Sequence, residues 1–126
     1  MSEPPAVVHR RYVSRADVHY AGDLVNGAFA LSCFGDVVTD LAITLDGDEG
    51  LLGAYSMVEF HAPLRAGDVV EFHATLTRQR TRTRTVDLIC RVVSRSVPEA
   101  GDTAAVVLDA PLLAVTAQAT YVVPAR

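Results

Sequence analysis

Two acidic residues of this sequence stand in positions that suit them to proton transfer. Asp36 lies inside a long apolar stretch, close to Phe34 and directly before Val37 and Val38. An ionised carboxylate is costly in such surroundings, so we expect burial to raise the pKa of Asp36 and to make it an acid–base catalyst. The alternative is a buried aspartate that only hydrogen-bonds a neighbouring strand or subunit. Asp40 follows about one helical turn later on the same face, where an interface role is equally natural.

Glu59 and His19 are the other two residues that we expect to move protons. Glu59 stands between Val58 and Phe60, so on a strand its side chain points to the face opposite theirs. His19 precedes the apolar stretch, and an imidazole exchanges protons near neutral pH. A histidine that packs there and bonds a backbone carbonyl is the alternative.

The elements that must position these groups can be read from the hydrophobic pattern. Residues 23–45 are mostly apolar and predict a helix that is buried on nearly every side. His9–Arg15 is a candidate first strand, and Pro4 and Pro5 predict that residues 1–7 form a loose arm. Later segments alternate with a period of two and predict four more strands: Tyr55–His61, Asp68–Gln79, Thr83–Ser96 and Leu112–Val123. A sheet wrapped around the helix would cover it, which predicts a single α+β domain over residues 1–126.

Composition excludes several classes of protein. The chain has 126 residues, half of them hydrophobic and 21% charged, which argues against disorder. The net charge is −4 and all 11 basic side chains are arginine, which argues against a nucleic-acid partner. Asn26, Asp36 and Asp40 interrupt the longest apolar run, so we expect no membrane span, and the N-terminus has no signal-peptide pattern, so we expect a cytoplasmic protein. Cys33 and Cys90 predict free buried thiols, and no spacing of cysteine and histidine predicts a metal site.

Several motifs together resemble one family. The discriminating ones are residues 19–27, which read HYAGDLVNG, the Phe34-Gly35-Asp36 triplet, and residues 46–51, which read DGDEGL. They are accompanied by Val58–Phe60, Ala62-Pro63, Ala66–Asp68, Leu108–Pro111 and Tyr121–Pro124. From Tyr12 onward the chain resembles the β-aminoacyl-CoA ammonia-lyases of the hotdog fold, which include 3-aminobutyryl-CoA and β-alanyl-CoA ammonia-lyase. Asp23 and Asn26 stand where that family has Asn and Asp, and Asp40 stands where it has Glu.

The resemblance implies reversible elimination of ammonia from a 3-aminoacyl-CoA to give the 2,3-enoyl-CoA. No cofactor is implied, since coenzyme A is part of the substrate. A carboxylate, Asp36 or Glu59, would remove the α-proton, and backbone N–H groups at the start of the helix would bind the enolate oxygen. The substrate-binding residues would then be Tyr20, Gly22, Asp23, Asn26 and Gly27. The alternative for this segment is a plain turn with Asp23 as the helix cap.

Arg80, Arg82 and Arg84 alternate with threonines, so on one extended strand their side chains would share a face. Such a row, Arg82 and Arg84 above all, could bind the phosphates of coenzyme A, or it could be a solvated strand edge. A hairpin turn near residues 80–82 is also compatible with the pattern. The resemblance further implies at least a homodimer with active sites at the subunit interface, where Asp36 and Glu59 of one site could come from different chains.

Three other functions compete with the lyase. An acyl-CoA thioesterase of the same superfamily would carry its helix carboxylate two positions before Asp36, where this chain has Phe34. A hotdog enoyl-CoA hydratase would have histidine five residues after an aspartate, and here Asp17 is followed at that distance by Gly22. A non-catalytic acyl-CoA-binding protein is the third alternative.

Overall fold

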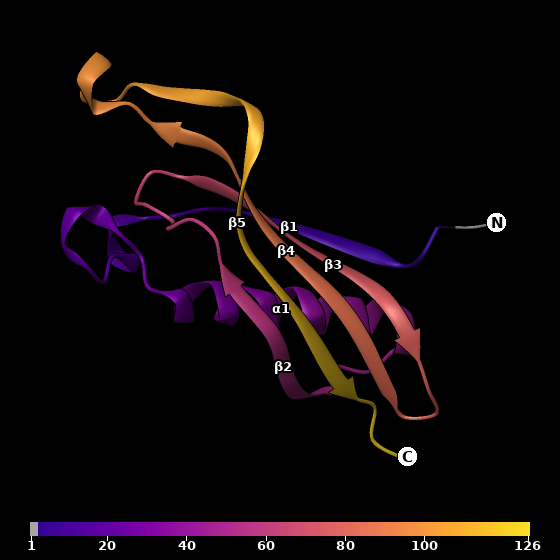
Figure 1. Cartoon of the computed structure of the whole chain (residues 1–126). Helices are drawn as coiled ribbons and strands as arrows, with labels where there is room; N and C mark the ends of the chain where they lie inside the picture. Colours follow the sequence, from indigo (N-terminus) through magenta and orange to yellow (C-terminus); the bar gives the residue numbers. More distant parts are fainter. Residues whose placement is uncertain (1–2) are drawn as a thin grey trace.

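The computed structural model describes residues 3–126, and Met1 and Ser2, part of the predicted arm, lie outside the described residues. The described chain forms one α-helix, α1 (Gly27–Asp46), and five strands: β1 (Ala6–Tyr12), β2 (Leu51–Phe60), β3 (Val69–Gln79), β4 (Thr83–Ser96) and β5 (Ala105–Val122). The strands form one antiparallel sheet in the order β1-β3-β4-β5-β2 (Figure 1). The sheet curves around α1, which confirms the predicted α+β architecture.

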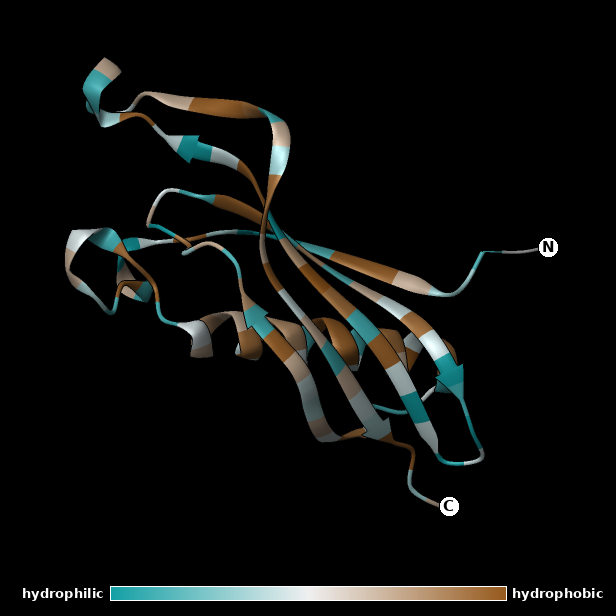
Figure 2. Ribbon diagram, in the orientation of Figure 1, coloured by the Kyte–Doolittle hydropathy of each residue, from teal (hydrophilic) through white to brown (hydrophobic). Residues whose placement is uncertain are grey.

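The core lies between α1 and the concave face of the sheet. Alternate residues of β3, β4 and β5 are buried against the helix, as a period of two requires. Figure 2 shows the corresponding brown and teal bands along these strands. On α1 the buried positions include Ala30, Phe34, Val37 and Leu41, which form one stripe. Phe34 packs edge to face on Phe72, with ring centroids 5.6 Å apart.

Some element boundaries differ from the sequence expectation. β1 begins at Ala6, inside the segment expected to be a loose arm, because residues 6–12 pair with β3 along their whole length. Pro4 and Pro5 block regular structure only at their own positions. β5 begins at Ala105 instead of Leu112, since residues 105–107 continue the pairing with the end of β4. The hairpin turn near residues 80–82 is confirmed, and Arg80 N donates to Thr83 O at 2.9 Å.

The predicted start of the helix at Asp23 was wrong. Gly22 and Asp23 have φ angles of 75° and 64°, which takes the chain out of the helical region. Asn26 is the N-cap, and its side chain accepts a hydrogen bond from Phe29 N at 3.1 Å. The helix ends at Asp46, and the left-handed conformation of the next residue, Gly47, allows its N–H to bond Ile43 O. By length and apolar composition alone α1 is long enough to span a membrane, a test that core helices also pass, and one face of it packs on the sheet.

Candidate active site

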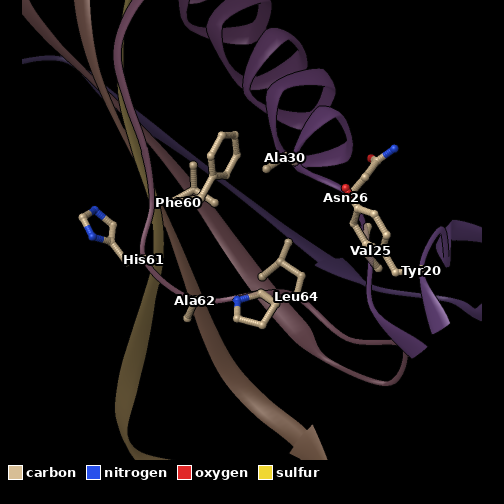
Figure 3. A pocket seen from close by; sticks show the side chains of 11 residues that line it. Tyr20, Val25, Asn26, Ala30, Phe60, His61, Ala62 and Leu64 are labelled. Carbon is tan, nitrogen blue, oxygen red and sulfur yellow. The ribbon is translucent and has the colours of Figure 1, made fainter. Parts of the chain in front are cut away.

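A hollow of about 420 Å³ opens where α1 begins and β2 ends (Figure 3). Its walls come from the turn before α1, the first turn of α1, and the loop that follows β2. Most of its lining is apolar, with polar groups from a few residues: Tyr20, Val25, Asn26, Gly27, Ala30, Phe60, His61, Ala62, Pro63, Leu64 and Val115. We call this hollow the helix-start cavity. It brings together three of the predicted substrate-binding residues, Tyr20, Asn26 and Gly27.

Backbone pairing holds the walls of the helix-start cavity in place. Val25 N donates to Leu64 O and Ala66 N donates to Asp23 O, both at 3.0 Å, so the turn before α1 is tied to the loop after β2. That loop is fixed in turn by Asp68, which has no exposed surface. Asp68 accepts bonds from Arg65 N and from the Arg95 guanidinium at 2.8–2.9 Å. Asp68 is therefore a structural anchor for the cavity wall.

The start of α1 provides hydrogen-bond donors beside the helix-start cavity. The first N–H groups of a helix have no partner within it, and here Asn26 accepts the bond from Phe29 and leaves Gly27 and Ala28 as first-turn donors. The helix dipole adds partial positive charge at this end. Gly27 lines the cavity, so an oxyanion placed there would meet these donors. Asp23 is not the cap, because its carboxylate pairs with Arg15 at 2.7 Å.

Asp36 differs from the prediction of a buried carboxylate. It is exposed, because it falls outside the buried stripe of α1. It lies at a groove of about 370 Å³ between β1 and α1, which we call the β1 groove and which also contains His9, Arg11 and Cys33. Asp40, one turn later, bonds the His9 imidazole at 2.6 Å. The buried stripe was readable from the sequence, and it would have placed Asp36 at the surface.

Glu59 is exposed and lies outside the lining of the helix-start cavity. β2 bulges between Ser56 and Glu59, and Met57 there has a φ of 54°. The Glu59 carboxylate approaches the His61 imidazole to 3.9 Å. Figure 3 shows that imidazole on the opposite side of the strand from the Phe60 ring, although His61 is part of the cavity lining. Within one chain, therefore, Asp36 and Glu59 border different parts of the molecule.

Tyr20, His19 and Tyr55 lie at different places relative to the helix-start cavity. Tyr20 is exposed at the helix-start cavity, and the predicted proton carrier His19 stacks edge to face on it, with ring centroids 4.7 Å apart. Tyr55 of β2 donates to Leu31 O at 2.6 Å and does not line the cavity. Desolvation raises the pKa of Tyr55, and the negative charge of Asp36 raises it further. Asp36 is thus within electrostatic reach of β2.

The predicted row of arginines does not form. Arg80 and Arg82 lie at the β3–β4 turn, whereas Arg84 is only 6% exposed. The Arg84 guanidinium donates to Asp46 Oδ1 at 2.9 Å and to Arg80 O at 2.7 Å. The prediction that Arg84 binds phosphate was therefore wrong, because its guanidinium is buried and paired with Asp46. Arg82 remains exposed.

The described residues offer little support for metal or thiol chemistry. Within residues 3–126, no group of three or more histidine, cysteine and acidic side chains is arranged to hold a metal ion. Cys33 and Cys90 are free and buried, as predicted. Desolvation raises the pKa of Cys33, and it raises that of Cys90 to about 12, so both thiols are protonated at neutral pH.

Sequence reasoning missed eight of the eleven residues that line the helix-start cavity. Two of these eight are Phe60, which served only to orient Glu59, and His61. The available signal was their position directly before Ala62-Pro63, since a proline next to a strand end marks the loop that closes the cavity.

Comparison with known proteins decides the family. The profile of the Thioesterase superfamily matches residues 22–94. Over 112 residues the chain is 45% identical to the 3-aminobutyryl-CoA ammonia lyase of Acetoanaerobium sticklandii, covering 89% of each chain. This chain belongs to the 3-aminobutyryl-CoA ammonia lyase family.

Solved structures agree with this family. The β-alanyl-CoA:ammonia lyase from Clostridium propionicum matches with a TM-score of 0.90 and 33% identity, covering 97% of this chain and 87% of that one. A hexameric thioesterase from Yersinia pestis matches with a TM-score of 0.77 and 18% identity, covering 98% and 92%. The second likeness shows the fold alone. The resemblance stated from the motifs is confirmed, and so is the hotdog fold.

Proposed function

We propose that this protein is a 3-aminoacyl-CoA ammonia-lyase that acts on 3-aminobutyryl-CoA or β-alanyl-CoA and forms the 2,3-enoyl-CoA. The observation that carries the proposal is the 45% identity, over 89% of both chains, with a protein named for that reaction. The helix-start cavity supports it, because a thioester carbonyl placed beside Gly27 would accept hydrogen bonds from the first-turn N–H groups.

The reaction needs one base and one site for negative charge. The base removes a proton from C2 of the 3-ammonioacyl thioester, and the electron pair becomes an enolate whose oxygen the N–H groups of Gly27 and Ala28 stabilise. The enolate then re-forms the carbonyl, the C2–C3 double bond forms, and the C3–N bond breaks with release of ammonia. The protonated base passes its proton to ammonia, so the products are enoyl-CoA and ammonium. Coenzyme A takes part as a portion of the substrate.

Asp36 and Glu59 are the carboxylates that we propose for proton transfer, with His19 beside Tyr20 as a third group. Because the two carboxylates border different parts of one chain, we place them in one site contributed by two subunits. The edge strand β2 supports this arrangement: Leu51 and Met57 on it are 65% and 73% exposed. Exposed apolar side chains on an unpaired edge favour pairing with another strand. We propose a homodimer, or a higher assembly built from it, with β2 of each subunit at the interface.

The direct test runs the reaction in reverse. Crotonyl-CoA or acryloyl-CoA is incubated with the protein and ammonium, and the enoyl absorbance is followed while a thiol reagent monitors free coenzyme A. Loss of absorbance without thiol release supports the lyase. Rapid thiol release with no amine adduct contradicts it.

Thioesterase activity is the second candidate, and the Thioesterase superfamily match over residues 22–94 favours it. Against it, the residue at the position of the thioesterase carboxylate is Phe34, which is completely buried and packs on Phe72. A non-catalytic acyl-CoA-binding protein is the third, and it would turn over none of the enoyl-CoA substrates. Release of free thiol distinguishes the thioesterase from the lyase. An unchanged enoyl absorbance identifies the non-catalytic binding protein.

A further inference from the structure

We infer that Phe60 determines which substituent at C3 of the acyl chain the helix-start cavity accepts. This inference rests on the proposed function, because it concerns the substrate of the same site. It assigns a specificity role to a residue at the end of β2 that takes no part in proton transfer.

The first observation is the close approach between Phe60 and the helix start. A Cβ atom added to Gly27 would lie 2.6 Å from Phe60 Cε1 and 2.7 Å from Phe60 Cζ. The tip of the ring therefore rests directly on the backbone of Gly27, and only a residue without a side chain leaves room for it. The ring stands next to the N–H donors that we assign to the thioester carbonyl.

The second observation is the direction and exposure of the ring. Figure 3 shows Phe60 pointing toward α1 near Ala30, whereas His61 points to the other side. Phe60 is the bulkiest purely apolar residue in the lining, and two of its neighbours there, Ala30 and Ala62, are small. The ring is 57% exposed, so it offers apolar surface to whatever occupies the cavity.

These observations place the ring against the reacting part of the substrate. C2 and C3 of the acyl chain follow directly after the carbonyl carbon. With the carbonyl oxygen bonded at Gly27, a hydrogen or methyl group on C3 meets the ring, and a longer chain must displace it. Phe60 therefore favours acryloyl and crotonyl chains over longer ones. A shortened side chain relaxes that preference.

The test compares kcat/KM for ammonia addition to crotonyl-CoA and to 2-hexenoyl-CoA in Phe60→Ala and in the wild type. We expect the ratio of 2-hexenoyl-CoA to crotonyl-CoA to rise by roughly 10-fold or more, the usual effect of one or two methylene groups in an apolar pocket. Val107→Ala is the matched control, because Val107 is an exposed apolar strand residue outside the cavity lining. An unchanged ratio in Phe60→Ala, or an equal rise in Val107→Ala, overturns the inference.

A second pair of variants tests the contact itself. Gly27→Ala should push the ring into the cavity and lower the rate with crotonyl-CoA more than the rate with acryloyl-CoA. Adding Phe60→Leu to Gly27→Ala should restore the ratio of these two rates. If Phe60→Ala alters the assembly in size-exclusion chromatography, Phe60→Leu replaces it in the test. Its ratio of kcat/KM for 2-hexenoyl-CoA to that for crotonyl-CoA should also rise, and an unchanged ratio overturns the inference.

A ligand-binding readout keeps this inference separate from the proposed function. If the wild type adds ammonia to neither acryloyl-CoA nor crotonyl-CoA, the lyase proposal fails. The affinities for butyryl-CoA and hexanoyl-CoA, measured by calorimetry, then test Phe60 by themselves. A gain for hexanoyl-CoA over butyryl-CoA in Phe60→Ala supports the role of the ring, and parallel changes in both affinities refute it.

Discussion

Asp46, the last residue of α1, connects the helix to two strands through its side chain. Its carboxylate accepts bonds from Arg84 Nη2 at 2.9 Å and from Tyr121 Oη at 3.0 Å. Tyr121 is almost fully buried, and desolvation together with the bond to Asp46 raises its pKa well above the usual value of a tyrosine. The three side chains close the end of the core that lies opposite the helix-start cavity.

Tyr121→Phe should lower the free energy of unfolding by about 1 kcal/mol at pH 8, because it removes one buried hydrogen bond. The folded state favours the neutral phenol, so in the unfolded chain the proton leaves first as the pH rises above 10. The wild type therefore loses this stabilisation at alkaline pH, and the difference between the two proteins should shrink. Urea unfolding of both proteins at pH 8 and pH 11 measures the difference in the free energy of unfolding. A larger difference at pH 11 contradicts the hydrogen bond assigned to Tyr121 and Asp46.

The carboxylates of the proposed reaction are also tested one at a time. Asp36→Asn and Glu59→Gln should each lower kcat/KM for ammonia addition by roughly 10²–10⁴-fold, the usual contribution of a positioned acid or base. Affinity for a saturated acyl-CoA should change little. Asp87→Asn is the control, because Asp87 is an exposed carboxylate that bonds Gln118 on the other face of the sheet. If kcat/KM falls by less than about threefold in one variant, the substituted residue takes no part in proton transfer.

At the scale of elements, the start of α1 determines the shape of the helix-start cavity. Asn26 caps the helix, while Asp23, three residues earlier, adopts a left-handed conformation and pairs with Arg15. The left-handed residues Gly22 and Asp23 turn the chain before the helix, and Tyr20 lies at the cavity on the other side of this turn.

Asn26→Ala should lower the free energy of unfolding by about 1 kcal/mol, the usual cost of removing a helix cap. Asp23→Asn, at the position that the sequence suggested as the cap, should cost much less, because it loses only part of an exposed ion pair. Chemical denaturation of both variants measures the difference. Equal losses would mean that Asp23 contributes to the cap after all.

Most of the fold was predictable because its signals are local. The alternation of β3 and β4 reports burial directly, and it survives in the structure. The prediction that the helix is buried on nearly every side was wrong, because the structure buries one stripe of α1 and leaves the other side exposed. The positions of Asp36 and Arg84 were not predicted, for different reasons. Asp36 was judged by its neighbours in sequence, although neighbours along a helix point in different directions. Arg84 was grouped with Arg80 and Arg82 in one row, although its actual partner, Asp46, lies 38 residues away in the sequence and no short motif specifies that contact.

The helix-start cavity was predicted only in part. Tyr20, Asn26 and Gly27 belong to one contiguous motif, so the sequence could place them together. Phe60 and Leu64 join them across long stretches of chain, through the bond from Val25 to Leu64. Such contacts form only in the completed sheet. The sequence pattern therefore favoured Glu59 as a site residue and not its neighbour Phe60, which lines the cavity.

At the scale of the whole molecule, the sheet ends on β2 with an apolar edge. β2 bulges at Met57, and no other part of residues 3–126 buries its exposed apolar side chains. The opposite edge, β1, differs because the β1 groove there carries His9 and Arg11.

A variant with Leu51→Lys and Met57→Lys should prevent edge pairing, because charged side chains on an edge strand disfavour strand addition. We expect a smaller species in analytical ultracentrifugation and a strong loss of lyase activity. Val107→Lys with Ile43→Lys serves as the control, because it adds the same two positive charges at exposed apolar positions outside β2. An unchanged sedimentation coefficient in the β2 variant would place the interface on another surface.

The separation of Asp36 from Glu59 within one chain has a consequence for mixtures of defective proteins. If each site takes one carboxylate from either subunit, Asp36→Asn and Glu59→Gln proteins are inactive alone but can complement each other. Random exchange of subunits would leave both carboxylates intact in roughly a quarter of the sites of a dimer. Activity should therefore return when the two preparations are unfolded and refolded together, and no recovery would place both groups on the same polypeptide.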